Sequence, residues 1–228
     1  MTHSEPRFSH LVVIGASAGG IESLSVLVST LPREFAAPIV IAQHLSPNRI
    51  SALGDILARR GLLPVRTIQN PEALEPGIIY VVPPGRDVAI TDHEVRLSDD
   101  AHGPQPSIDL LFTSASKIFQ KNLIAVVLSG TGSDGAAGAR DVKNAGGTIV
   151  IQSPDTAAYP GMPLSLARSD VDIVADRERI GGILTELVAG TLTIPPVTAH
   201  SQLRSFLNEL RDESGIDFTS YKQATIER

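Results

Sequence analysis

The chain has 228 residues, 42% hydrophobic and 19% charged, with a formal net charge of −6. This length and balance are typical of one globular domain with a short appendage and exclude a disordered chain. An acidic chain with 4% aromatic residues and no tryptophan is poorly suited to binding nucleic acid. Because cysteine is absent, disulfides, thiolate catalysis and Cys-ligated metals are excluded.

The start of the chain and its apolar runs bear on location. Residues 1–10 are polar and contain no apolar core of a signal peptide. No apolar run approaches the roughly 20 residues that span a bilayer. We therefore expect a cytoplasmic protein without membrane insertion. The histidines and carboxylates show no metal-ligand spacing, so we expect no metal and no cofactor.

Short apolar runs alternate with amphipathic segments along most of the chain. In chain order the pattern predicts a strand at 11–14, a helix at 21–31, a strand at 38–42, a helix at 49–60 closed by a left-handed Gly61, antiparallel strands at 78–82, 88–90 and 95–97, a helix at 107–119 capped by Ser107, a strand at 123–128, a helix at 135–145, a strand at 148–151, a short helix at 164–168, a strand at 171–174 and a helix at 177–189.

Buried strands that alternate with helices predict an α/β fold. We expect a doubly wound, Rossmann-like, mostly parallel sheet with helices on both faces, plus an antiparallel hairpin. In such folds ligands bind at the carboxyl ends of the strands. The residues that follow each strand are therefore the first candidates for a site.

The first predicted strand runs into Gly15-Ala-Ser17-Ala-Gly19, which fits the pattern G-x-S-x-G between a strand and a helix. Such a turn is sharp, so its neighbours are small and its serine stands exposed at the top of the sheet. The alternative is a phosphate-binding loop, which also uses glycines at this kind of junction. Because the segment matches neither the dinucleotide fingerprint nor the Walker loop, we favour a nucleophile at Ser17.

Two other polar residues follow predicted strands. His44 closes the segment after the strand at 38–42, and Asp134 lies in the loop after the strand at 123–128. Taken alone, His44 could be a core histidine, and Asp134 could cap the next helix. A neutral imidazole beside a serine activates it, and a carboxylate orients the imidazole. We therefore predict a triad of Ser17, His44 and Asp134, in a chain order that differs from that of α/β-hydrolases.

Five motifs spread along the chain carry a family resemblance: Val13–Gly20, Ala42–His44, Pro106–Asp109, Leu128–Ala136 and Gly161–Pro163. Together they resemble the catalytic domain of the chemotaxis protein-glutamate methylesterases, the CheB family. The resemblance implies hydrolysis of glutamate γ-methyl esters on chemoreceptor helices. It makes Ser17 the nucleophile, His44 the general base and acid, and Asp134 its partner. It also raises deamidation of receptor glutamines as a second activity.

The chain departs from the pattern of the best-known family members in several places. Ala18 replaces a threonine, and Thr131 stands where methionine is common. We expect backbone N–H groups near Ala18 and Thr131 to bind the oxyanion, and Gly132 and Met162 to line the site. Standard members carry an N-terminal receiver domain. Because the first predicted strand begins at Leu11, we expect no control by phosphorylation in cis.

The last part of the chain is predicted to lie outside the methylesterase domain. We expect residues 1–194 to form the methylesterase domain and residues 195–228 to be a linker and the start of a further domain. Residues 203–228 look similar to the start of the receptor methyltransferases, the CheR family, which implies a fused methyltransferase. The alternative is a helix that packs back onto the first domain, because Leu203, Phe206, Leu207 and Leu210 form an apolar stripe.

Three rival functions stay open. The first is a catalytically silent module that binds a partner through the same surface. The second is an esterase for small molecules, which needs a closed apolar pocket rather than a broad cleft. The third is a nucleotide-binding regulator, which needs a loop that cradles phosphate.

Overall fold

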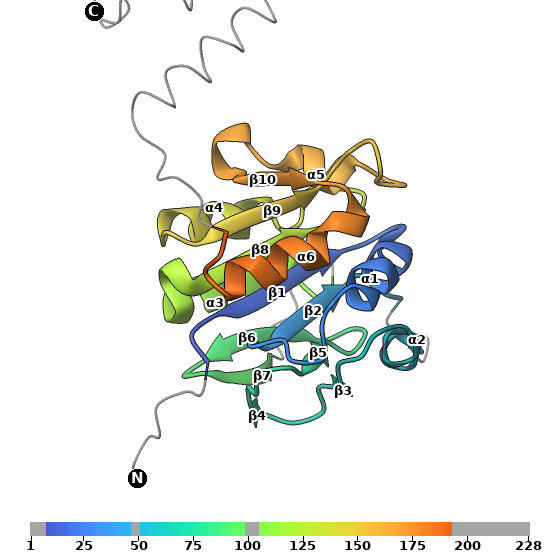
Figure 1. Cartoon of the computed structure of the whole chain (residues 1–228), viewed down its shortest axis with the longest axis vertical. Coiled ribbons are helices and arrows are strands. Elements are labelled where there is room, and N and C mark those ends of the chain that lie inside the picture. The colour runs from blue at the N-terminus through green and yellow to red at the C-terminus, as the bar shows by residue number, and fades with distance from the viewer. Residues whose placement is uncertain (1–7, 47–50, 99–104, 193–228) are drawn as a thin grey trace, which may run out of the picture. The chain divides into compact units, whose positions relative to one another are not determined.

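The computed structural model describes residues 8–46, 51–98 and 105–192, and a parallel sheet of seven strands runs through them (Figure 1). The strand order is β10-β9-β8-β1-β2-β5-β3, and each neighbouring pair is parallel. The strands are β1 (Leu11–Ala16), β2 (Ile39–Gln43), β3 (Val65–Thr67), β5 (Ile79–Val81), β8 (Leu123–Val127), β9 (Thr148–Gln152) and β10 (Ile173–Ala175).

Helices cover both faces of this sheet, which confirms the predicted fold class. On one face α1 packs against α6 and α2, and on the other α3 packs against α4 (Figure 1). The helices are α1 (Gly20–Ser29), α2 (Leu53–Arg60), α3 (Ile108–Phe119), α4 (Ala136–Asn144), α5 (Gly161–Ser165) and α6 (Arg177–Val188), with short 3₁₀ turns η1 (Gln120–Asn122) and η2 (Arg168–Asp170).

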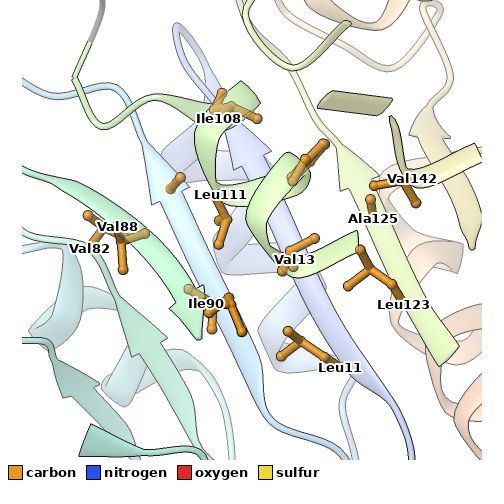
Figure 2. Close-up of a cluster of buried hydrophobic side chains, with 14 of the residues drawn as sticks. Leu11, Val13, Val82, Val88, Ile90, Ile108, Leu111, Leu123, Ala125 and Val142 are labelled. Carbon is orange, nitrogen blue, oxygen red and sulfur yellow. The ribbon is translucent and has the colours of Figure 1, made fainter. Parts of the chain in front are cut away.

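The core explains why the central strands are apolar throughout. All six residues of β1 are buried, because strands in the middle of a parallel sheet are covered on both faces. Figure 2 shows Leu11 and Val13 of β1 on the face where Ile108 and Leu111 of α3 lie. Alternate residues of the strand point to the opposite face.

A second sheet extends the core on the side of α3. It is antiparallel, with the order β4-β7-β6, and consists of β4 (Glu72–Ala73), β6 (Asp87–Thr91) and β7 (Glu94–Ser98). Val88, Ile90 and Val95 join the same apolar cluster as α3. The predicted antiparallel strands at 88–90 and 95–97 are therefore confirmed.

Three details of the predicted secondary structure are wrong. The run at 78–82 forms β5 of the parallel sheet, because it pairs with β2 and β3 rather than with the hairpin. Gly61 is extended (φ −110°) rather than left-handed. Glycine is needed there because a Cβ atom would lie 2.8 Å from the carbonyl oxygen of Val28 on α1. The short helix occupies Gly161–Ser165 instead of 164–168, since Leu166 is already extended.

Some predictions fall outside the described residues. The helix predicted at 49–60 begins at Leu53 in the described part, and residues 47–50 are not described. The chain divides after Leu192 into two units, and the second, Thr193–Arg228, lies outside the described residues. The predicted boundary at 194 and the predicted tail helix lie there too. Within the described ranges, no helix has the length and apolarity to traverse a bilayer.

Candidate active site

Ser17 stands in the turn between β1 and α1. Its backbone N–H donates to the carbonyl oxygen of Ser129, the second residue after β8 (3.0 Å). Gly19 has a φ of 72°, in the left-handed region, and a Cβ atom there would lie 2.7 Å from the hydroxyl oxygen of Ser129. Only glycine fits at position 19 of this turn. The sharp turn leaves Ser17 partly exposed at the carboxyl edge of the sheet.

His44 directly follows β2, the strand next to β1. Its backbone N–H donates to the carbonyl oxygen of Ala16 (3.0 Å), so the residue sits level with the start of the serine turn. The imidazole Nδ1 lies 3.2 Å from the hydroxyl oxygen of Ser17, and Nε2 lies 2.8 Å from Oδ2 of Asp134. The side chains of His44 and Asp134 are 16% and 11% exposed, so both ends of the imidazole are largely shielded from water.

Asp134 is held by the N-terminus of α3 rather than by the helix that follows it. Its two carboxylate oxygens accept the backbone N–H groups of Ile108 (2.8 Å) and Asp109 (2.9 Å), in the first turn of α3. The alternative that Asp134 caps α4 is wrong, because Gly135 occupies the N-cap position in a left-handed conformation (φ 101°). A helix N-terminus carries partial positive charge and stabilises an anion.

The hydrogen bonds of Asp134 keep it ionised. Burial alone would raise the pKa of Asp134, but hydrogen bonds from His44, Ile108 and Asp109 outweigh burial and place the pKa below its ordinary value. An ionised carboxylate only accepts hydrogen bonds, so Nε2 of His44 carries the hydrogen. The lone pair of Nδ1 therefore faces Ser17, as a base requires.

Asp109 caps α4 as Asp134 caps α3, a reciprocal pair of helix caps that the sequence analysis did not predict. Its Oδ1 accepts the backbone N–H groups of Gly135 (3.0 Å) and Gly138 (2.6 Å), at the N-terminus of α4. Burial, with the neighbouring Asp134 charge, raises the pKa of Asp109 despite those hydrogen bonds. Each carboxylate thus caps the helix that begins beside the other. The motif Pro106–Asp109 contains this residue, but its spacing gives no indication of α4.

The other predicted site residues lie around the serine. The loop after β8 exposes Thr131 and Gly132, and Gly132 has a φ of 86°. Met162 of α5 is completely buried against Gly130, where a Cβ atom would lie 2.0 Å from its sulfur and 2.9 Å from Cβ of Ser17. Among the described residues, no acceptor binds the backbone N–H of Ala18 or Thr131. Both N–H groups are therefore available to a ligand.

Gln43 is a second residue that the sequence analysis did not place in the site. It ends β2, is 2% exposed, and its amide nitrogen donates to the carbonyl oxygens of Ser17 and His44. The available signal in the sequence was the polar Gln43 directly after the apolar run 39–42, next to the predicted base.

The chain matches one family model, CheB methylesterase, over residues 12–184. Among solved structures, the CheB methylesterase catalytic domain of Thermotoga maritima superposes with a TM-score of 0.72 at 34% identity, covering 79% of this chain and 99% of that domain. The match extends over the sheet and helices that carry Ser17, His44 and Asp134.

Curated relatives have consistent names. A relative in Leptospira interrogans is 34% identical over 180 residues, which are 77% of this chain and 93% of its own length. It is provisionally named a protein-glutamate methylesterase/protein-glutamine glutaminase. Proteins of Saccharophagus degradans (37%) and Thermotoga maritima (33%) are named protein-glutamate methylesterase/protein-glutamine glutaminase. The matches cover 70% and 82% of this chain but only 45% and 57% of those proteins. This chain belongs to the CheB methylesterase family.

Proposed function

We propose that the chain hydrolyses γ-methyl esters of glutamate residues on the cytoplasmic helices of chemoreceptors, with Ser17 as nucleophile, His44 as general base and acid, and Asp134 as its orienting partner. One observation carries the proposal. In a chain of this family, a hydroxyl, an imidazole and a carboxylate from three neighbouring strand ends are joined by contacts of 3.2 Å and 2.8 Å.

The first half of the reaction forms an acyl-enzyme. Nδ1 of His44 takes the proton of Ser17 as the hydroxyl oxygen attacks the ester carbonyl carbon. The carbonyl oxygen becomes an oxyanion, which the N–H groups of Ala18 and Thr131 stabilise. His44 then gives its proton to the leaving methoxide, and methanol departs. Asp134 stabilises the imidazolium that exists between these two transfers.

The second half restores the enzyme. His44 takes a proton from water, the resulting hydroxide attacks the acyl carbon, and the C–O bond to Ser17 breaks. His44 returns the proton to the serine oxygen, and a glutamate carboxylate is released. Deamidation of glutamine belongs to the same proposal, because it differs only in the leaving group, which is ammonia. Relatives carry both activities in their names.

An exposed aromatic side chain beside the serine turn supports a protein substrate. Tyr159 is 48% exposed, and its ring lies 3.2 Å from where a Cβ atom on Gly19 would be. An apolar surface beside a reactive group suits a helix surface better than a small soluble ester, which needs enclosure.

The test is methanol release from methylated receptor membranes by the wild type, Ser17→Ala and the matched control Ser46→Ala, an exposed serine near His44. Loss of the nucleophile should lower kcat about 10⁶-fold, whereas the control should retain it. A Ser17→Ala protein with near-normal turnover would refute the triad. A wild type that binds receptor without releasing methanol would favour the partner-binding alternative. The fused methyltransferase stays a prediction for residues 195–228.

A further inference from the structure

We propose that Gln43 is a positioning residue, whose amide group holds the nucleophile and the base at the separation that proton transfer needs. The inference deepens the proposed function and depends on it. Gln43 is buried at the last position of β2, beside Gly20 on α1 and directly before His44. No polar group of a substrate needs to reach it.

The amide nitrogen of Gln43 bridges the two residues that react. It donates one hydrogen bond to the carbonyl oxygen of Ser17 (2.8 Å) and one to the carbonyl oxygen of His44 (3.0 Å). A primary amide has two N–H donors, so both are used. The backbone of the nucleophile and the backbone of the base are thus joined through one rigid planar group.

This bridge begins where the sheet ends. The parallel register of β1 and β2 runs as far as Ala16 and Gln43, and the N–H of His44 donates to the carbonyl of Ala16. From Ser17 onward the segment that follows β1 turns into α1, while the segment that follows β2 leaves the sheet after His44. Beyond this point the two segments no longer pair through their backbones. The side chain of Gln43 supplies the next hydrogen-bonded link between them, at Ser17 and His44.

The unused end of the amide argues against a role in stability alone. Oε1 of Gln43 is buried and has no hydrogen-bond partner within the described ranges. A buried acceptor without a partner disfavours the folded state, and an apolar side chain of the same length would avoid this penalty. Gln152, at the end of β9, has both ends of its amide bonded, to the N–H of Ser129 and the carbonyl of Thr156. The two hydrogen bonds that Gln43 donates, rather than its acceptor, are therefore the reason for an amide at this position.

The geometry it holds is sensitive to small shifts. The contact between Ser17 and His44 is 3.2 Å, at the long end of the range for a hydrogen bond. Any widening of the gap between the two backbones reduces the fraction of molecules in which the proton can move. Misplacement of a catalytic group by about 1 Å can lower a rate about 100-fold.

The test replaces Gln43 with methionine, which is similar in length but has no N–H donors. Gln43→Met should lower kcat for methanol release about 10- to 100-fold, with KM changed less than about twofold. The rate of Ser17 labelling by a fluorophosphonate should fall in parallel, because that reaction needs the same proton transfer and no receptor. Gln43→Asn, which keeps an amide too short to reach both carbonyls, should behave in the same way and serves if the methionine variant does not fold.

Tyr80→Phe is the matched control for lost buried hydrogen bonds. Tyr80 is buried on β5, and its hydroxyl accepts the N–H of Glu75 and donates to the carbonyl of Ala73, without bonding any residue of the triad. This variant should have a lower unfolding temperature with unchanged kcat and labelling rate. The inference is overturned if a folded Gln43 variant keeps wild-type kcat, or if kcat falls equally in Tyr80→Phe. Neither result touches the proposed function, which fails if Ser17→Ala remains active or if the wild type releases no methanol.

Discussion

The carboxyl edge of β1, β2 and β8 differs from the antiparallel sheet β4-β7-β6 in what each buries. The edge buries the amide of Gln43 and shields the carboxylate of Asp134, and one of these polar groups keeps an unmet acceptor. The antiparallel sheet also buries polar groups, the carboxylate of Asp87 and Nδ1 of His93 in its turn, but these do not contact the triad. Most of what it buries is apolar, and Val88, Ile90 and Val95 belong to the core. Its ion pair between Arg96 and Glu94 faces solvent.

This contrast shows how the molecule divides stability from chemistry. Burying polar groups stabilises little, because each hydrogen bond replaces one with water, but it fixes side chains in place. Burying apolar area stabilises the fold without placing any reactive group. Substitutions at the edge should therefore act mainly on kcat, and those at the apolar positions of the antiparallel sheet mainly on the free energy of unfolding.

After Ser17→Ala, the largest effect is expected from Asp134→Asn, which removes the charge but keeps the shape. Without an anionic acceptor the imidazole is no longer held with its Nδ1 lone pair toward Ser17, so kcat should fall about 10⁴-fold. Methanol release measures this, and circular dichroism checks that the fold is intact. A folded variant within about tenfold of wild-type kcat would remove the distinction between the two regions.

The opposite result is expected from Ile90→Ala in the antiparallel sheet. Ile90 is 2% exposed, so the substitution leaves a cavity and should lower the free energy of unfolding by about 2–5 kcal/mol. Denaturant titration measures the loss. Turnover of the protein that remains folded should match the wild type, and a specific fall in kcat would show that this sheet also shapes the site.

Asp109→Ala tests the link between the two helix starts. It leaves the N–H groups of Gly135 and Gly138 without their acceptor, which should destabilise the fold by about 1–2 kcal/mol. Asp109→Asn keeps an acceptor oxygen and should recover most of that loss in the same denaturant titration. Equal stability of both variants and the wild type would mean that the reciprocal caps contribute nothing.

The same two carboxylates should respond to pH in opposite directions. The pKa of Asp134 is lowered on folding, so its stabilising contribution is present above about pH 3.9 and is lost as the pH falls through its folded pKa. The pKa of Asp109 is raised, so its contribution is present below about pH 3.9 and is lost as the pH rises through its folded pKa.

Unfolding free energies measured from pH 3 to pH 7 would reveal both effects. Relative to Asp134→Asn, the wild type should lose stability more steeply at the acid end. Relative to Asp109→Asn, it should gain stability as the pH falls from neutral toward about 4. Parallel curves for all three proteins would contradict the assigned shifts.

The smallest effect is expected from Arg96→Ala. Its partner Glu94 lies two residues away on the same strand, and the two side chains are 56% and 39% exposed. Exposed ion pairs contribute less than about 1 kcal/mol, so stability and kcat should both stay near wild type. A larger loss in denaturant titration would mean that the surface of this sheet matters more than its buried face.

Most of the fold follows from local patterns along the chain. The strands at β1, β2, β8 and β9 are apolar because both of their faces are covered, and such runs are recognisable without any partner. The pairing of β5 was not predictable in this way. A three-residue strand carries no information on its neighbour, and the turn that follows it resembles a hairpin.

The chain order of residues was sufficient to nominate Ser17, His44 and Asp134, since each follows a buried strand and parallel strands end at one edge. The contacts that hold those side chains could not be read in the same way. Asp134 bonds the start of α3, 26 residues earlier, and Gln43 bonds Ser17, 26 residues earlier. Such partners meet only once helices and strands have packed, because hydrogen bonds depend on distance in space and not on separation along the chain.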